Sequence, residues 1–592
     1  MNPFLALFFF FLTNPLPVFP SSFPDRFTKS LSPSLLPHKS KDYFELAHPL
    51  PSDRLTPSST FPILRHSFAN TINAPPFTTS YSPPSDCLPP WSFVVLEFRA
   101  KCKGEQYDRI SGLWLAGVEL LRTSTAEPNQ CGIFWKVRKD VTRYSSLFSR
   151  SNLDLTMMLE NVVNKEYTGV YHVEVNLLFY KENLTNRNFD RKLGFVGDNL
   201  GLKSDELDPN LGVEVEKPAD LIIPISDSGD RGFWFRIESE LDLGTRKIRI
   251  PKNTRRAVLE LYVSFHGNDE FWYSNPPNSY VAMNNLDTRR ANGAYREVFV
   301  TIDGELVGSE VPFPVVFTGG INPLFWEPVV AIGAFNLPSY DLELTPFLEK
   351  LLDKKLHTIG IGVSEGISYW LVNANLHLWL DHNSRSVEAK SSFSQKPSLE
   401  IEKGFQFSKL DGSFKIKAER ATEYIGWVKW SGGNHTTTFS QTCKFKNKIR
   451  FQNNGSYKST KQKIKAKKEL RVTNEKHVTI RRTSLKRRYP LNVITATFPG
   501  SRRDTYILVT NVSHSMKDKY VDRDHQRRVH NTQDSGGWME VKDHSVISGY
   551  ANTRQTFGYS DGFGCYLRTV DASNGRLVRD ITTFDCLSLS PS

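Results

Sequence analysis

The chain contains few of the residues that usually mark metal centres and thiol chemistry. Among its 592 residues there are only six cysteines. None of them belongs to a C-x-x-C pair or to a Cys/His cluster with the spacing of zinc ligands. We therefore expect neither a zinc site nor a catalytic thiol, and no metal or other cofactor.

Long apolar segments are also scarce. The clearest apolar run is Phe4–Leu12, which is too short to span a bilayer. It has the form of the apolar region of a secretory signal peptide, and residues 1–20 are predicted to be one, although no basic residue precedes the run and prolines follow it. A fortuitous apolar start is the alternative. We expect a soluble protein of the secretory pathway, located outside the cell, in the cell wall or in the vacuole, without a membrane anchor.

Two further features bear on that compartment. Four N-x-Ser/Thr acceptor sequences agree with it, and they begin at Asn183, Asn434, Asn454 and Asn511. The six cysteines permit three disulfides, but their connectivity cannot be deduced from spacing. We expect the local pairs Cys87–Cys102 and Cys565–Cys586.

Positive charge is concentrated in one part of the chain. The formal net charge is +12, and much of the excess lies between Lys444 and Arg488. Blocks of like charge repel one another and usually stay solvated, so this stretch is predicted to be an exposed, poorly ordered loop. No zinc knuckle, RNA-recognition motif or basic heptad accompanies it. Nucleic acid is therefore not an expected partner.

Alternation with a period of two is frequent, whereas helical patterns are rare. Tyr171–Leu177 and Val258–His266 alternate apolar and polar residues as half-buried strands do. Val298–Ile302 runs into Asp303-Gly304, a type I′ hairpin sequence. Only Pro346–Leu352 has a helical pattern. Many short strands without intervening helices predict an all-β fold of antiparallel sandwiches.

Composition divides the rest of the chain into four parts. Residues 21–87 are rich in Pro, Ser and Thr and are predicted to form an extended arm on the surface, not a core-forming unit. A first sandwich is expected at residues 88–217 and a second at 218–385. Residues 386–592 are expected to form a C-terminal β-rich domain that carries the basic stretch.

Two segments collect residues that could carry chemistry. In Tyr107-Asp108-Arg109 an acid stands at the start of a strand, where the rim of a sandwich is open to ligands. The segment His266–Pro277 brings two acids, a histidine, an amide and three aromatic residues into one loop. Because acids in polar turns are common, Asp108 and Glu270 are only candidates on these grounds.

Both segments lie in a long stretch that resembles the plant peptide-N-glycanase A family, the peptide-N4-(N-acetyl-β-glucosaminyl)asparagine amidases. The resemblance covers nearly all of residues 88–385 and is looser in the tail. The motifs that carry it are Tyr107-Asp108-Arg109, Asp140–Tyr144, Tyr167–Val173, Ala219–Ser226, Asn268–Asn275 and Phe317–Pro323. The more distant bacterial members of the F type consist of two jelly rolls. The resemblance thus implies two antiparallel jelly-roll β-sandwiches packed side by side, followed by the C-terminal domain.

The resemblance also implies a reaction. It is hydrolysis of the amide bond between the first N-acetylglucosamine of an N-glycan and Asn, which releases a glycosylamine and leaves Asp. Asp108 would act on the water or hydrogen-bond the reacting amide, and Glu270 would orient or stabilise. A third acid is implied near Glu160. Arg109 either keeps the Asp108 carboxylate charged or forms an outward salt bridge.

Substrate-binding candidates surround these acids. They are Arg109, Asp269, Trp272 and Tyr273. The two rings would stack on sugar faces, and Trp326 could do the same or pack in the core. His266 is interpreted as a rim histidine more readily than as a base.

The expected partner is an N-glycopeptide or a denatured N-glycoprotein. The resemblance also implies tolerance of core α1,3-fucose and processing of the chain into two associated chains. The main alternative is a non-catalytic secreted glycan-binding β-sandwich protein, which would keep the aromatic residues but tolerate loss of Asp108. A structural cell-wall protein is a further alternative.

Overall fold

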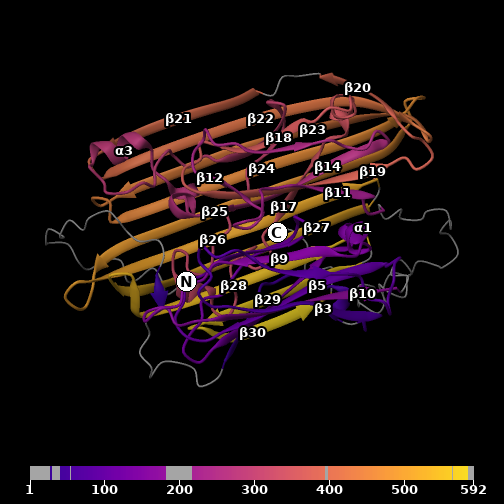
Figure 1. Ribbon diagram of the computed structural model, residues 1–592. Coiled ribbons are helices and arrows are strands. Elements are labelled where there is room, and N and C mark those ends of the chain that lie inside the picture. The colour runs from indigo at the N-terminus through magenta and orange to yellow at the C-terminus, as the bar shows by residue number, and fades with distance from the viewer. Residues whose placement is uncertain are drawn as a thin grey trace.

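The computed structural model describes residues 27–29, 40–53, 55–181, 217–393, 398–523, 525–562 and 564–584 (Figure 1). Residues 1–20, Asn183 and Cys586, on which three of the predictions rest, lie outside the described residues. Nearly all of the described chain is β-structure in antiparallel sheets, apart from short parallel pairings, so the predicted all-β fold is confirmed. Within these ranges no helix has the length and apolarity needed to cross a membrane.

Residues 41–180 build the first sandwich from two sheets that share one core. One sheet has the strand order β2-β8-β5-β10-β3, and the other has the order β4-β9-β6-β7. The alternation predicted for Tyr171–Leu177 is confirmed, because the apolar residues of this segment are buried in the core. The strands are β2 (Lys41–Tyr43), β3 (Ser59–Phe68), β4 (Phe77–Tyr81), β5 (Phe93–Cys102), β6 (Ile110–Leu115), β7 (Val118–Ser124), β8 (Ile133–Asp140), β9 (Leu153–Leu159) and β10 (Tyr171–Tyr180).

The first sandwich begins earlier in the chain than predicted. Residues 59–81, expected in a surface arm, form β3 and β4, which pair with β10 and β9. Leu64, Phe68 and Tyr81 are buried in the core. The arm interpretation is wrong here because the apolar residues of these strands complete both sheets, despite the surrounding Pro and Ser.

The second sandwich again consists of two sheets. Their orders are β11-β19-β14-β17, with β12 paired to β19, and β13-β18-β15-β16. The predicted hairpin at Asp303-Gly304 is confirmed, since both residues have positive φ (50° and 83°), as a type I′ turn requires. The strands are β11 (Leu221–Ile225), β12 (Phe235–Ile237), β13 (Gly244–Ile248), β14 (Thr254–Phe265), β15 (Glu297–Ile302), β16 (Glu305–Glu310), β17 (Ser339–Glu343), β18 (His357–Ser364) and β19 (Trp370–Leu380).

Helical segments are short throughout the described chain. The helix expected at Pro346–Leu352 is present as a 3-10 turn, η8 (Thr345–Phe347), that continues into α4 (Leu348–Leu351). The others are η3 (Pro51–Asp53), η4 (Thr142–Tyr144), α1 (Ser145–Phe148), η5 (Gly267–Asp269), η6 (Trp272–Ser274), α3 (Asn278–Met283) and η7 (Pro323–Trp326).

A buried polar network joins the two sandwiches. Arg122 on β7 makes two hydrogen bonds to Glu119 and donates to the carbonyl of Leu371 on β19 at 2.6 Å. Across the same contact Tyr144 donates to Glu260 on β14 at 2.6 Å. Burial alone would raise the pKa of Glu260, but neighbouring cations, Arg143 foremost, hold it well below its usual value. Such paired, fully hydrogen-bonded charges fix one sandwich against the other.

The C-terminal part forms a large sheet of long strands, which extend across most of the width of the molecule (Figure 1). The basic stretch is not the predicted loop, because it makes up much of three of these strands. Its buried alternate residues, among them Phe445, Ile449 and Ile464, fill the core, and the charged ones point away. The strands are β1 (Thr28–Lys29), β20 (Glu388–Phe393), β21 (Ser398–Ser408), β22 (Asp411–Trp430), β23 (Gly433–Gln452), β24 (Tyr457–Asn474), β25 (Thr479–Pro499), β26 (Thr505–Asp522), β27 (His525–Lys542), β28 (Ser545–Ser560), β29 (Cys565–Ser573) and β30 (Arg576–Thr583).

The inner face of this sheet packs on the second sandwich. Lys468 on β24 forms an ion pair with Glu310 on β16 at 2.6 Å, and Arg420 on β22 forms one with Glu297 on β15 at 2.7 Å. All four side chains are largely buried. Buried charges have to be paired, so these contacts hold the sheet in a defined position.

The structure tests one of the two predicted cysteine pairs. Cys87 and Cys102 are free thiols, so the proposed bond between them is wrong. Cys102 is the last residue of the ten-residue strand β5, whereas Cys87 precedes the start of that strand. Cys565 is disulfide-bonded. Its proposed partner Cys586 lies outside the described residues.

Candidate active site

Asp108 lies at the open end of the β6–β7 hairpin. The ladder extends one residue beyond both strands, because the amide of Thr125 donates to the carbonyl of Arg109 at 2.8 Å, and the amide of Arg109 donates to Oγ1 of Thr125 at 2.9 Å. Asp108 therefore leaves the hairpin beside the segment that carries Glu127. Paired backbone on both sides gives these two acids a fixed separation.

A buried tyrosine holds this segment from behind. The hydroxyl of Tyr171 donates to the carbonyl of Tyr107 at 2.9 Å and accepts from Oγ1 of Thr125 at 3.1 Å. Burial raises the pKa of Tyr171 well above its usual value, so the hydroxyl stays protonated and able to donate. The residues that flank Asp108 and Glu127 are thereby tied to the core of the first sandwich.

A glycine from the second half of the fold covers the two acids. Oγ1 of Thr318 donates to the carbonyl of Thr125 at 2.8 Å and brings the next residue, Gly319, against both carboxylates. A Cβ atom at Gly319 would lie 2.4 Å from Oδ1 of Asp108 and 2.5 Å from Oε1 of Glu127. The two oxygens are thus at most about 4.9 Å apart, the sum of these distances. Only glycine allows so close an approach.

Two polar groups of this cluster have no hydrogen-bond partner in the described part of the chain. Asp108 is 5% exposed, and its Oδ1 is buried without a partner. Nη2 of Arg109 donates to Gln106 at 2.7 Å, but Nε of the same guanidinium is buried and unpaired. Arg109 forms no ion pair there, so its predicted outward salt bridge is not seen. Buried groups left unsatisfied are costly, which makes an acceptor and a donor together a candidate ligand site.

Two tyrosines lie next to the acids and remain accessible. Tyr107 precedes Asp108, and its ring packs against that of Tyr167 with centroids 5.2 Å apart. Both side chains are only half-buried. An aromatic pair at the edge of a buried polar cluster offers ring faces on which sugars can stack.

The second candidate segment has a different environment. Asp269 is fully buried and paired with Arg296, whose Nε and Nη2 donate to it at 2.7 and 2.8 Å. It also accepts from the indole of Trp370 at 2.7 Å and from the amide of Ile367 at 2.9 Å. Asp269 is therefore held by protein partners on both oxygens, which does not fit the expected role in substrate binding.

Glu270 lies on the other side of the glycine pair. It is 2% exposed and close to Tyr273, whose pKa is raised well above its usual value by burial and by the charge of Glu270. The following residue, Phe271, contacts Gly320, since a Cβ there would lie 3.1 Å from its ring. The Gly319-Gly320 turn thus touches the Asp108 segment with one residue and the Glu270 segment with the next.

The aromatic residues of this loop are part of the core. Trp272 and Tyr273 are 0% and 1% exposed. The ring of Trp272 packs against Phe445 of the C-terminal sheet at 6.3 Å, and Asn447 donates to the carbonyl of Tyr273 at 2.8 Å. Neither ring presents a face for the expected stacking on sugars. Trp326 is also buried, and its indole donates to the carbonyl of Gly320 at 2.8 Å. Of its two predicted roles, the structure shows packing in the core.

Two other residues of the sequence hypotheses are less informative. His266 is buried and not at the rim, with Nε2 at 2.9 Å from Oγ of Ser264 and its ring stacked on Phe317. Glu160 directly follows β9 and is half-buried. In the described residues its carboxylate forms no hydrogen bond or ion pair.

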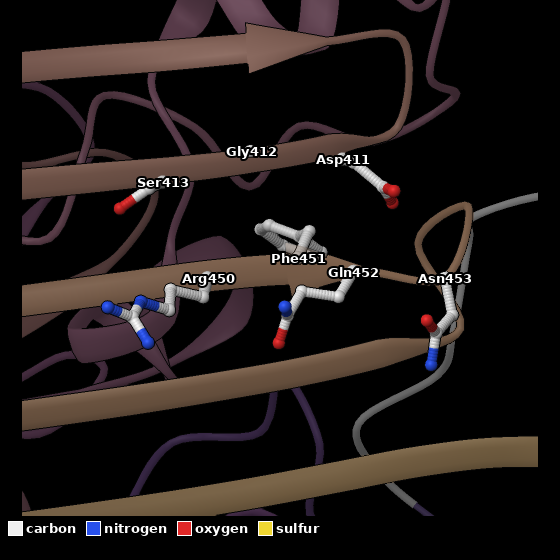
Figure 2. Close-up of a pocket in the computed structure, with 7 residues that line it drawn as sticks. All are labelled: Asp411, Gly412, Ser413, Arg450, Phe451, Gln452 and Asn453. Atoms are coloured by element: carbon white, nitrogen blue, oxygen red, sulfur yellow. The ribbon is translucent and has the colours of Figure 1, made fainter.

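Two cavities of the described chain are lined by residues other than these acids. One cavity of about 410 Å³ lies between β22 and β23 near Asp411 and Arg450 (Figure 2). Another, of about 350 Å³, is lined by Cys102, Thr168 and His172. Among the residues that the structure describes, no three His, Cys, Asp or Glu side chains gather as metal ligands do. The candidate site is thus the buried acid cluster itself.

Several residues of this cluster escaped prediction from sequence. Tyr171 and Gly319 lie in two of the motifs that carry the family resemblance, Tyr167–Val173 and Phe317–Pro323, but neither was a candidate, and Glu127 lies outside these motifs. The signal for Gly319 was its Gly-Gly pair, because adjacent glycines indicate close approach of backbone to another group. Nothing in the spacing linked it to Asp108, since the contact spans two sandwiches.

The fold and site define an all-β protein of two fixed sandwiches with a buried pair of acids where they meet. Residues 48–397 match the family described as peptide N-acetyl-beta-D-glucosaminyl asparaginase amidase A, and residues 413–491 match its C-terminal domain. The chain is 41% identical over 548 residues to peptide-N4-(N-acetyl-beta-glucosaminyl)asparagine amidase A of Prunus dulcis, which covers 92% of this chain and 93% of that protein. The chain belongs to this amidase A family, as its motifs indicated.

Two solved structures are similar more remotely. PNGase F, a glycosylasparaginase from Flavobacterium meningosepticum, is 13% identical over 54% of this chain and 96% of its own, with a TM-score of 0.32. A structure of PNGF-II is 12% identical over 55% of this chain and 65% of its own, with a TM-score of 0.36. Similarity at this level supports no correspondence between individual residues.

Proposed function

We propose that the chain hydrolyses the amide bond between the innermost N-acetylglucosamine and Asn of N-glycopeptides or denatured N-glycoproteins. The glycan leaves as a glycosylamine, and Asn becomes Asp. Two findings support this function. The chain belongs to the amidase A family, and it matches nearly the whole length of the Prunus dulcis protein, whose name states this activity. The observation that carries the site is the unpaired, buried Oδ1 of Asp108 beside Glu127.

Asp108 acts on the attacking water in this proposal. Its unpaired oxygen accepts a proton from the water, whose oxygen adds to the side-chain carbonyl of the substrate Asn. The unpaired Nε of Arg109, the residue that follows Asp108, donates to the oxyanion that develops on that carbonyl. Both groups are already in place on a hydrogen-bonded hairpin, so little reorganisation is needed.

Glu127 supplies the proton for the leaving group. Two carboxylates whose oxygens are within about 4.9 Å repel each other when both are charged in a buried site. We therefore assign the role of acid to Glu127 and the role of base to Asp108. When the carbon–nitrogen bond breaks, this proton goes to the departing nitrogen, which leaves as the amino group of the glycosylamine.

Glu270 and the accessible tyrosines complete the proposed site. Glu270 orients or stabilises the substrate from the far side of the Gly319-Gly320 turn. Tyr107 and Tyr167 replace Trp272 and Tyr273 as the residues that stack on the sugar, because their rings are accessible. Metal and cofactor play no part in this scheme.

The test is an assay on a short N-glycopeptide that follows the mass change from Asn to Asp, with Asp108→Asn in parallel. We expect conversion by the wild-type protein and none by the variant. If the wild-type protein binds the glycopeptide without converting it, the non-catalytic glycan-binding alternative is correct. If Asp108→Asn converts it at the wild-type rate, the site assignment is wrong.

Location and maturation are proposals as well. Secretion or delivery to the vacuole is supported by the exposure of Asn454 and Asn511, two of the acceptor asparagines. A shift in gel mobility after enzymatic removal of glycans would test it. Processing into two associated chains would be visible as two bands whose termini mass spectrometry can define.

A further inference from the structure

The outer face of the C-terminal sheet carries rows of lysine and arginine that lie directly opposite one another. In one row Lys444, Lys465, Arg488 and Lys517 are consecutive partners on β23–β26. In the next, Lys467, Lys486, Lys519 and Arg528 are partners on β24–β27. We call this outer side of β22–β27 the basic face. It comprises these two rows and the two rows described next.

Two further rows continue the basic face towards β22. They consist of Lys417, Lys446 and Lys463, and of Lys415, Lys448 and Lys461. Side chains of these rows are exposed or half-exposed, whereas the alternate residues on the same strands are buried against the second sandwich. The basic residues therefore form a continuous surface and not isolated charges.

Acids neutralise only a small part of this surface. Ion pairs join Lys417 to Glu402, Lys444 to Glu419 and Lys467 to Glu469. The remaining lysines and arginines of the four rows form no ion pair in the described residues. On the inner face, by contrast, Lys468 and Arg420 are both paired with acids.

The charges of neighbouring rows repel one another. Neighbouring cations lower the pKa of Lys463, with Arg488 the largest contributor. Burial and the neighbouring cations Arg450, Lys415 and Lys461 lower the pKa of Lys448. Like charges directly opposite on a sheet destabilise it, so this arrangement costs stability that an anionic partner would return.

We propose that the basic face binds a linear polyanion, and specifically an acidic polysaccharide with a carboxylate on successive sugars. Cations repeat roughly every 6.7 Å along a strand and about every 4.8 Å across strands, which offers a chain of regularly spaced carboxylates many simultaneous contacts. Phe498 and Trp538, exposed aromatic residues of β25 and β27, lie further along these strands and outside the four rows, so bases would find no ring to stack on within the rows. A flat sheet also has no helix to enter a groove, so nucleic acid fits less well.

The test uses the full-length protein with polygalacturonate, neutral dextran and duplex DNA as immobilised ligands. We expect binding to polygalacturonate that weakens as salt is raised, no binding to dextran, and weaker binding to DNA. Lys446→Glu, Lys463→Glu, Lys465→Glu and Arg488→Glu together should weaken polygalacturonate binding about 100-fold or more.

A matched control reverses four exposed charges elsewhere, at Arg246, Lys247, Arg249 and Lys252. It should retain most of the binding, and both variants should keep wild-type turnover of a soluble glycopeptide, which shows that they are folded. Equal binding losses in the two variants, or no loss in the first, would overturn the proposal. Stronger binding to DNA than to polygalacturonate would overturn it in favour of nucleic acid.

Discussion

Asp108 and Asp269 are both buried aspartates beside aromatic residues, yet their surroundings are opposite. Asp269 accepts hydrogen bonds from Arg296, Trp370 and Ile367, so both of its oxygens have protein partners. Asp108 has an oxygen without a partner, next to a second acid, Glu127, and a glycine. The first arrangement compensates the buried charge within the protein, and the second leaves a buried acceptor unpaired.

The difference shows how one residue type divides between structure and chemistry. A buried carboxylate costs free energy unless cations and donors compensate for the loss of hydration. Asp269 is compensated within the protein, which gives its loop a rigid position against the C-terminal sheet. In the cluster of Asp108 and Glu127 the loss of hydration is only partly compensated by protein partners, which is common at sites that bind and transform a ligand.

The largest effect on stability is expected from Asp269→Asn. The substitution leaves Arg296 as a buried cation without its counter-charge, which should lower the free energy of unfolding by about 3–5 kcal/mol. Unfolding in urea would measure it. Glu305→Gln is a matched control, because its pair with Lys350 is exposed and should change the stability by less than about 1 kcal/mol. If Asp269→Asn unfolds like wild type but loses activity, the structural role of Asp269 is refuted.

How far the sequence predicted these features depended on the range of the interactions. Local patterns were sufficient for β10 (Tyr171–Tyr180), for the Asp303-Gly304 hairpin and for α4 (Leu348–Leu351). The basic stretch was misinterpreted because the positive charge of every second residue obscured a clear alternation, as in Lys463-Ile464-Lys465-Ala466. Its buried residues pack against the second sandwich, and the sequence of the stretch alone gives no indication of that contact.

Site residues show the same limit. Asp108 and Glu270 could be named from motifs, but the ion pair of Asp269 with Arg296 and the contact of Gly319 with Glu127 bring together distant parts of the chain. Burial of Trp272 depends on Phe445, which belongs to the C-terminal sheet. Such contacts determine which acid has protein hydrogen-bond partners, and they cannot be predicted from the spacing of residues in the sequence.

Glu127→Gln sharpens the contrast on the Asp108 side. The amide keeps the shape but cannot deliver a proton to the leaving nitrogen, so we expect kcat to fall about 100-fold with little change in KM. The acidic role also predicts loss of the high-pH limb of the pH profile of kcat, which steady-state assays on a glycopeptide would show. Glu105→Gln, in the turn between β5 and β6, should keep wild-type kcat, because its carboxylate accepts from Gln130 at the surface. An unchanged kcat and pH profile in Glu127→Gln would show that this acid is only structural.

Gly319→Ala tests the close approach of the turn to both acids. Its Cβ would overlap an oxygen of Asp108 and one of Glu127, so the acids or the turn must move. Overpacking of this kind costs about 1–3 kcal/mol, and we expect at least a tenfold loss of kcat/KM together with a lower Tm. Gly304→Ala offers a comparison, because a Cβ there meets no atom within 4 Å, although its positive φ adds some strain. Activity at the wild-type level in Gly319→Ala would mean that the acids are not held by this contact.

Glu327, like Asp269, is a buried carboxylate paired with cations of the protein. Its low pKa means that this pairing should be detectable as a pH dependence of stability. Burial alone would raise the pKa of Glu327, but Lys29 and Lys41, which pair with it at 3.4 and 2.6 Å, hold it at about 2. Because the folded-state pKa lies below the unfolded value, the carboxylate stabilises the fold above about pH 4.5, and this stability is lost as the pH falls towards 2. Between pH 5 and pH 3 the loss should reach about 2 kcal/mol. Urea unfolding of wild type and Glu327→Gln at both pH values isolates this contribution, since the difference in their free energies of unfolding should shrink at pH 3. A difference that stays constant would show that the two lysines do not stabilise the charged form.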